Sequence, residues 1–161
     1  MEKLLHIDQN PKFPEIYKGV ILNTPGSNSI KILDYGLNMS SYINENNKYN
    51  FYYGFIPMTF INEYPIYTSF FTVRKLDVFD VVDLQPIYAI KILSSFGVLN
   101  IIFGKPSFDE IVPNKEYIIK NIEEFFKPDK ILVEYENIAK RLLEEGLKGY
   151  NSKYIKIRKN L

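Results

Sequence analysis

The sequence predicts an α+β domain that is mainly β, with a small barrel of short strands over residues 15–108 and two helices over residues 113–148. Two observations lead to this prediction. Up to residue 108, short β-rich runs alternate with turns that contain Pro, Gly or Asn, which is typical of a barrel or a sandwich. From residue 113 onward, the apolar residues recur at helical spacing. No repeat or linker divides the 161 residues, so we expect one domain over 1–161.

The expected strands are short and lie between clear turn signals. Residues 1–14 are expected to be an irregular lead-in, because Pro11 and Pro14 block regular structure. Pro57 should end the aromatic run 51–55, and the polar segment 37–50 should be a long loop with one weak strand. The β-branched and aromatic runs predict strands at 16–22, 30–33, 51–55, 66–73, 78–82, 87–93 and 98–103.

The first expected helix begins after Asn114, a residue type that often caps helix N-termini. Its apolar stripe consists of Ile118, Ile122 and Phe125, which follow the i, i+4, i+7 pattern. Pro128 lies just beyond its end. These features predict one helix with a single buried face.

A second helix is expected from about Val133 to Lys148, with Ile138, Leu142 and Leu143 facing inward. The glycine after Lys148 should mark its end. Residues 150–161 are expected to form a basic, loose tail.

Composition excludes several classes of function. The net charge of +1 lacks the basic excess of nucleic-acid-binding domains, so we expect no nucleic-acid partner. The absence of cysteine excludes disulfides, thiolate metal sites and a cysteine nucleophile, and fits a cytoplasmic protein. The apolar stretches are much shorter than the about 20 residues of a membrane span, and the N-terminal segment lacks the apolar core of a secretory signal. We therefore expect no membrane partner.

Segment 53–59, with the sequence Tyr-Gly-Phe-Ile-Pro-Met-Thr, resembles the Tyr-Gly-Phe-Ile-Pro-x-Thr segment of family I soluble inorganic pyrophosphatases. Other segments resemble that family in the same order: the first strand and the following Gly-Ser-Asn turn (16–31), Leu-Gln-Pro-Ile (84–87) and the helix end Glu-Glu-Phe-Phe (123–126). The resemblance covers roughly 14–148. It implies a five-stranded, OB-like closed β-barrel with two C-terminal helices, and a homo-oligomer, because prokaryotic members form homohexamers.

Enzymes of this family hydrolyse pyrophosphate with several Mg²⁺ ions, which bridge phosphate oxygens and activate a bound water. Mg²⁺ requires hard oxygen ligands, so such a site is rich in carboxylates. The family supplies three of these from an Asp-x-Asp-Pro-x-Asp loop. Here residues 62–67 read Asn-Glu-Tyr-Pro-Ile-Tyr, so Pro65 remains, Glu63 is the one acid, and Tyr67 stands at the last Asp position.

The other acidic positions are also changed. Asn23 and Leu33 stand where the family has Glu, and a pair of Asp with a Lys falls in the uncharged segment 94–101. Ser41 stands near the position of the phosphate-binding Arg. Of the family's C-terminal Tyr-Lys pair, only Lys130 is kept. The resemblance therefore implies a catalytically degenerate member whose magnesium site is lost.

Three residues persist as substrate-binding candidates, Lys31, Tyr53 and Lys130, and Glu63 is the remaining catalytic candidate. No metal ligands are predicted. Loss of one catalytic group typically lowers a rate by ~10²–10⁴. Loss of nearly the whole set should leave no metal-dependent rate.

Three functions remain open. The first is a pseudoenzyme with a structural or interaction role, which needs no cofactor. The second is a divergent Mg-dependent inorganic diphosphatase that recruits Glu63 with Asp34 or Asp77. The third is a non-hydrolysing module that binds phosphate or pyrophosphate. The aromatic segments 49–55 and 64–71 would make the family's charged cleft apolar, which suggests a filled-in site or a contact surface.

Overall fold

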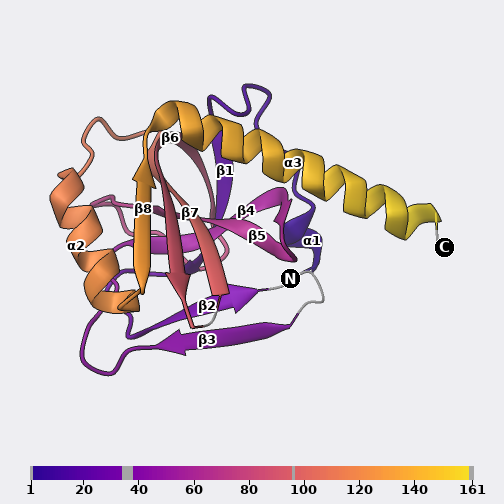
Figure 1. Ribbon diagram of the computed structural model, residues 1–161. Helices are drawn as coiled ribbons and strands as arrows, with labels where there is room; N and C mark the ends of the chain where they lie inside the picture. The colour runs from indigo at the N-terminus through magenta and orange to yellow at the C-terminus, as the bar shows by residue number, and fades with distance from the viewer. Residues whose placement is uncertain (1, 34–37, 96, 160–161) are drawn as a thin grey trace.

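The computed structural model describes residues 2–33, 38–95 and 97–159 (Figure 1). The described elements are α1 (Glu2–Leu5), β1 (Tyr17–Asn23), β2 (Ser29–Leu33), β3 (Met39–Ile43), β4 (Tyr52–Ile61), β5 (Tyr64–Phe70), β6 (Val81–Ser94), β7 (Gly97–Pro106), α2 (Lys115–Phe126), β8 (Lys130–Glu134) and α3 (Glu136–Lys159). The protein is mainly β with helices, as predicted. No helix in the described part is long and apolar enough to cross a membrane.

Five strands close into a ring. The sheet order is β1-β4-β5-β7-β6-β8, and β1 also pairs with β6, so β1, β4, β5, β7 and β6 form a closed circuit. The β5–β7 pairing is parallel, and the other pairings of the ring are antiparallel. Gly54 permits the close β1–β4 contact, because a Cβ there would lie 1.9 Å from the Val20 carbonyl oxygen. The predicted five-stranded closed barrel is confirmed.

Alternating residues of the barrel strands face two apolar clusters. On β7, Ile102 belongs to a cluster that is completed by Ala139 and Leu143 of α3. Its neighbours Ile101 and Phe103 belong to the other cluster. Residues of α2, the β2–β3 hairpin and β8 pack on that second face of the strands. We call it the hairpin face.

Two prolines lie inside strands rather than at the strand boundaries where they were expected. β4 continues past Pro57 to Ile61, with a shift in its register against β5 between Ile56 and Ile61. The two strands expected around Pro86 are one strand, β6, whose register against β7 shifts between Pro86 and Tyr88. A register irregularity removes the need for a ladder hydrogen bond, so a residue without an N–H group is tolerated there.

Helix α2 agrees with the prediction. The Asn114 side-chain oxygen accepts a hydrogen bond from the Glu116 N–H at 2.8 Å, and Ile118, Ile122 and Phe125 are buried. The next element was not predicted: β8 pairs with β6 from Ala89 to Leu93. Its residues alternate between exposed and half-buried positions, a weak signal within five residues. Helix α3 consequently begins at Glu136 rather than near Val133.

The expectation of a loose segment after residue 149 is wrong, because α3 continues to Lys159 and projects beyond the barrel (Figure 1). Gly149 lies inside the helix. A Cβ at this position would lie 2.1 Å from the Phe60 carbonyl oxygen, so this glycine allows α3 to lie directly on β4. Of the predicted inward residues, Leu143 is buried and Leu142 packs partly buried against the same cluster, whereas Ile138 is exposed. Ala139 and Tyr150 are also buried and were not predicted.

The lead-in is more ordered than expected. It contains α1, whose Leu5 is buried. The His6 Nδ1 atom and the Tyr150 hydroxyl form a hydrogen bond. The Gln9 side chain donates to the Pro57 carbonyl at 2.8 Å and accepts from the Lys18 N–H at 2.8 Å. These contacts attach residues before β1 to α3 and to the barrel.

Candidate functional site

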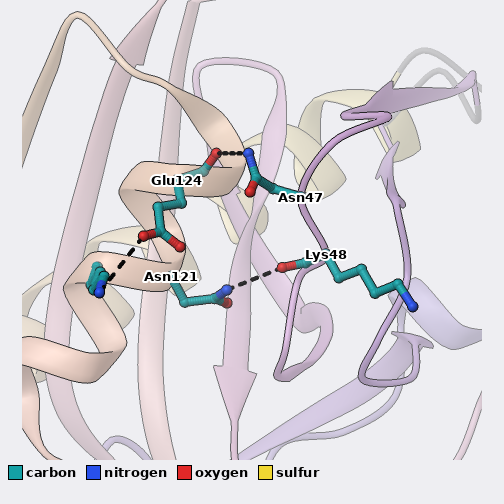
Figure 2. A network of polar contacts seen from close by, with 5 residues as sticks. Asn47, Lys48, Asn121 and Glu124 are labelled. Atoms are coloured by element: carbon teal, nitrogen blue, oxygen red, sulfur yellow. Dashed lines mark hydrogen bonds and ion pairs between the residues drawn. The ribbon is translucent and has the colours of Figure 1, made fainter.

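The residues that the family resemblance singles out lie mostly on the hairpin face. The loop that follows β3 is fastened to α2 (Figure 2). The Asn121 side chain donates to the Lys48 carbonyl at 3.0 Å, and the Asn47 side chain donates to the Glu124 carbonyl at 3.2 Å. The buried Asn44 donates to the Phe125 carbonyl at 2.9 Å. The bonds from Asn47 and Asn44 satisfy carbonyls at the end of α2, and all three bonds hold the helix over this face.

Aromatic rings occupy the space beneath the hairpin and α2. We call them the aromatic cluster: Tyr42, Tyr49, Phe51, Tyr53, Tyr67, Phe103, Phe125 and Phe126. All of these residues except Tyr42 are fully or almost fully buried. Most ring contacts are edge-to-face at 5.1–5.9 Å between centroids, which is a favourable packing geometry. The face is a packed core.

Tyr67, which the resemblance places at the family's last Asp, holds the hairpin. Its hydroxyl donates to the Leu33 carbonyl at 2.9 Å and accepts from the Leu33 N–H at 3.0 Å. The resemblance places Leu33 itself where the family has Glu. Two positions that the resemblance assigns to metal-binding acids are therefore joined to each other by hydrogen bonds between a phenol and a buried backbone. These bonds need no metal.

Asn23, at another Glu position, has a similar role on β1. Its side-chain oxygen accepts from the Lys31 N–H at 3.0 Å, and its side-chain nitrogen donates to the Ser29 carbonyl at 3.2 Å. An ionised carboxylate could accept the bond from the Lys31 N–H but could not donate to the Ser29 carbonyl. The amide thus fits the backbone of β2 better than the Glu that the resemblance implies for this position.

Tyr53 is completely buried. Its ring stacks on Tyr67 with centroids 5.4 Å apart and planes 15° apart. Its hydroxyl has no hydrogen-bond partner among the described residues. Burial, and to a smaller degree the nearby Tyr67 and Tyr49, raises the pKa of Tyr53 well above its ordinary value. The hydroxyl therefore stays protonated and is closed off from solvent.

Of the other predicted site residues, Lys31 is linked to the strand beside Tyr53, because its N–H donates to the Asn23 side chain and Asn23 is the β1 partner of Tyr53. Lys31 is half-buried on β2, opposite Ser41 of β3, and Lys130 is exposed at the start of β8. Glu63 is exposed in the tight turn between β4 and β5, with φ of 75°. The strand rise of ~3.3 Å places this turn roughly 17 Å along β5 from Ser69, the cross-strand partner of Tyr53. In the described part, no hydrogen bond or ion pair joins any two of the four candidates.

The described residues contain no group of three or more His, Asp or Glu side chains that could hold a metal ion. Asp77 is exposed, and its N–H donates to the Asp80 carboxylate at 2.8 Å within a loop. Asp34 lies outside the described residues. In the uncharged segment 94–101, the Ser94 hydroxyl and the Asn100 side-chain oxygen are buried without a partner among the residues described.

The sequence analysis did not predict that the hydroxyl of Tyr49 and the Asn side chains of segment 44–50 form hydrogen bonds within the fold. The Tyr49 hydroxyl bonds the Ser69 hydroxyl within the aromatic cluster, and burial raises the pKa of Tyr49. The Asn-rich composition of 44–50 was the available signal for the attachment to α2, because Asn side chains often bond nearby backbone groups. Nothing local in the sequence shows that their partners lie in a distant helix.

Known proteins match this chain in structure but not in sequence. No family model matches the chain, and no curated protein matches it significantly. Solved structures do match: the inorganic pyrophosphatase from Thermus thermophilus has a TM-score of 0.75 at 18% identity, over 92% of this chain and 98% of that chain. The inorganic pyrophosphatase from Neisseria gonorrhoeae has a TM-score of 0.72 at 18% identity, over 92% and 99% of the two chains. The enzyme from Helicobacter pylori has a TM-score of 0.68 at 16% identity, over 90% and 98%. The chain has the inorganic pyrophosphatase fold.

Proposed function

We propose that this chain is a pyrophosphatase-fold protein without metal-dependent hydrolytic activity, and that its role is structural or one of interaction. The observation that carries the proposal is the contact between Tyr67 and Leu33. Two positions that the resemblance assigns to carboxylates bind each other there, inside a buried aromatic cluster. Without carboxylates, little displaces the waters that Mg²⁺ holds tightly.

The same contacts bear on the two other functions. A diphosphatase that recruits Glu63 would need to bring this exposed turn residue to a bound phosphate, and no second acid lies with it in a metal-binding group of the described residues. A phosphate-binding module would need the Tyr53 hydroxyl, which is buried beneath the hairpin. Lys31 and Lys130 remain accessible for weak phosphate binding. We therefore propose no Mg²⁺ requirement, and we propose a cytoplasmic location because the chain has no cysteine.

Phosphate release tests the proposal. The purified chain is incubated with pyrophosphate and Mg²⁺ or Mn²⁺ at high protein concentration, beside an active pyrophosphatase as the positive control. We expect release at the background rate and no change on Glu63→Gln. The matched control is Glu110→Gln, also an exposed acid in a loop. Metal-dependent turnover that Glu63→Gln abolishes and Glu110→Gln preserves would refute the proposal.

Binding without hydrolysis gives a separate signal. A ligand that binds the folded state alone raises Tm by mass action. We expect no pyrophosphate-dependent rise in Tm. A rise that disappears on Lys31→Ala but persists on Lys75→Ala would instead support the phosphate-binding module.

A further inference from the structure

The proposed interaction role does not say which surface of the chain binds a partner. The free edge of β8 is the candidate surface. β8 is the last strand of its sheet and pairs with β6 on one side (Figure 1). On the other side, the described residues offer it no strand and no further backbone hydrogen bond. An unpaired edge presents N–H and C=O groups that can bind another strand.

The sequence of β8 reads Lys-Ile-Leu-Val-Glu from 130 to 134. If a second copy of this strand lies antiparallel to the first, centred on Leu132, then Lys130 lies opposite the second copy's Glu134, and Glu134 lies opposite its Lys130. Leu132 lies opposite its own copy, and Ile131 lies opposite Val133. The strand is therefore self-complementary in charge and in apolar character. Oppositely charged residues that face each other across strands are stabilising, and like charges are destabilising.

The side chains of β8 have the exposure that such pairing needs. Lys130 and Glu134 are exposed, and Leu132 at the centre is 40% exposed although it is apolar. None of the three has an ion pair or side-chain hydrogen bond among the described residues. Charged residues commonly protect an edge strand from association. Here the opposite signs at the two ends make the protection ineffective against an inverted copy of the same strand.

The surface next to this edge carries charges of both signs. A groove of about 320 Å³ lies over the face of the sheet, between α3 and the strands β8, β6 and β7, and Lys91, Glu134, Arg141 and Glu145 are among the residues that line it. The groove is on the β6 side of β8, so the pairing at the free edge is carried by the self-complementary sequence of the strand. Side chains of both signs beside the edge favour a two-fold copy of the chain over a uniformly charged partner.

We propose that two copies of this chain associate through antiparallel pairing of β8 with β8, about a two-fold axis at Leu132. The pairing joins the two sheets into one that runs β6-β8-β8-β6 through the dimer. It holds whether or not the chain hydrolyses pyrophosphate, so the assays of phosphate release and of assembly can fail independently. A five-residue strand contact is small, so we expect a reversible dimer with Kd on the order of micromolar to tens of micromolar.

Charge reversal tests the register. Sedimentation velocity of the full chain should show concentration-dependent dimers. Lys130→Glu and Glu134→Lys should each raise the dimer Kd roughly tenfold or more, because each creates two like-charge pairs per dimer. The double variant Lys130→Glu/Glu134→Lys should restore wild-type Kd. The matched control, Lys75→Glu in an exposed loop, should have no effect. Melting curves show whether each variant is folded.

A cysteine variant supplies a second readout. The chain has no cysteine, so Leu132→Cys introduces one thiol. Facing residues of an antiparallel pair have Cα atoms ~4.5–5.5 Å apart, within reach of a disulfide. Oxidised glutathione, which accepts the two electrons and two protons of the thiols, should convert Leu132→Cys to a covalent dimer at least roughly tenfold faster than Val73→Cys, which is 89% exposed and remote in sequence.

Three results overturn the proposal. They are a wild-type chain that stays monomeric at about 1 mM, single charge reversals that leave Kd unchanged, and a double variant that fails to restore association. If the wild type forms a hexamer, as the pyrophosphatase resemblance suggests, Lys130→Glu should split it into smaller species; a hexamer unaffected by Lys130→Glu would equally reject β8 pairing.

Discussion

Two neighbouring tyrosines allow one chemical change to be tested in two environments. Tyr53 and Tyr67 stack on each other and are both completely buried. Removal of each hydroxyl by substitution with Phe preserves the ring and its packing. The difference between their unfolding free energies therefore compares a buried hydroxyl that has hydrogen-bond partners with a buried hydroxyl that has none.

Tyr67→Phe should destabilise the protein. The substitution leaves the buried N–H and C=O of Leu33 without the partner that the Tyr67 hydroxyl supplies. A buried polar group without a partner costs about 1–3 kcal/mol, so two such groups lower the free energy of unfolding by about 2–6 kcal/mol. The lower end of that range alone corresponds to a fall in Tm of about 4–8 °C for a domain of this size.

Tyr53→Phe should behave in the opposite way. Its hydroxyl is buried without a partner, so removal of it eliminates a desolvation cost. The free energy of unfolding should stay constant or rise by up to about 1–3 kcal/mol. The assay is urea denaturation followed by far-UV circular dichroism for the two variants and the wild type. Equal destabilisation by both variants would refute the description of the hairpin face as a dry core, because Tyr53 would then have a partner such as bound water.

Two further predictions concern other parts of the molecule. Gly149→Ala should lower the free energy of unfolding by about 1–3 kcal/mol, because the new Cβ would lie 2.1 Å from the Phe60 carbonyl oxygen and push α3 from β4. Urea denaturation measures this change, with the exposed Lys148→Ala as the control. A gain in stability, as expected if alanine acted only as a better helix former, would contradict the close approach. Stability should also fall as the pH rises through 10. Burial raises the pKa of the three buried tyrosines Tyr17, Tyr49 and Tyr53, so the folded state keeps protons that the unfolded state loses. The sign follows from linkage, because a group whose pKa is raised in the folded state stabilises it below the unfolded-state pKa, and this stabilisation is lost as the pH rises above that value. The three tyrosines together lower the free energy of unfolding by about 4 kcal/mol between pH 9 and 11. Denaturation across this range measures the loss, and titration of all tyrosines of the folded chain near pH 10 would contradict it.

Local chemistry was enough to predict many of the elements. The Asn114 cap and the stripe of Ile118, Ile122 and Phe125 are properties of one helix, so they can be recognised without knowledge of its neighbours. The barrel strands are likewise visible as β-rich runs between turns. The barrel closure, however, depends on β1 pairing with both β4 and β6, which no single segment reveals.

The positions where the resemblance implies acids show the same difference between what residue identity and what tertiary contacts reveal. The family resemblance implied that carboxylates are missing at Asn23, Leu33 and Tyr67, because residue identity decides whether Mg²⁺ has oxygen ligands. It was not apparent that Tyr67 bonds to Leu33, or that Asn23 holds β2, because both contacts depend on the distance between strands that are far apart in the chain.

Helix α3 shows most clearly that tertiary packing can override a local preference. Glycine at position 149 indicates a helix end in the sequence, since glycine readily adopts the left-handed conformation that terminates helices. In the structure the same glycine is helical, and its missing Cβ lets α3 contact the Phe60 carbonyl. Local preference favours the end of the helix there, but the packing of α3 on β4 outweighs it, and only the tertiary structure contains that contact.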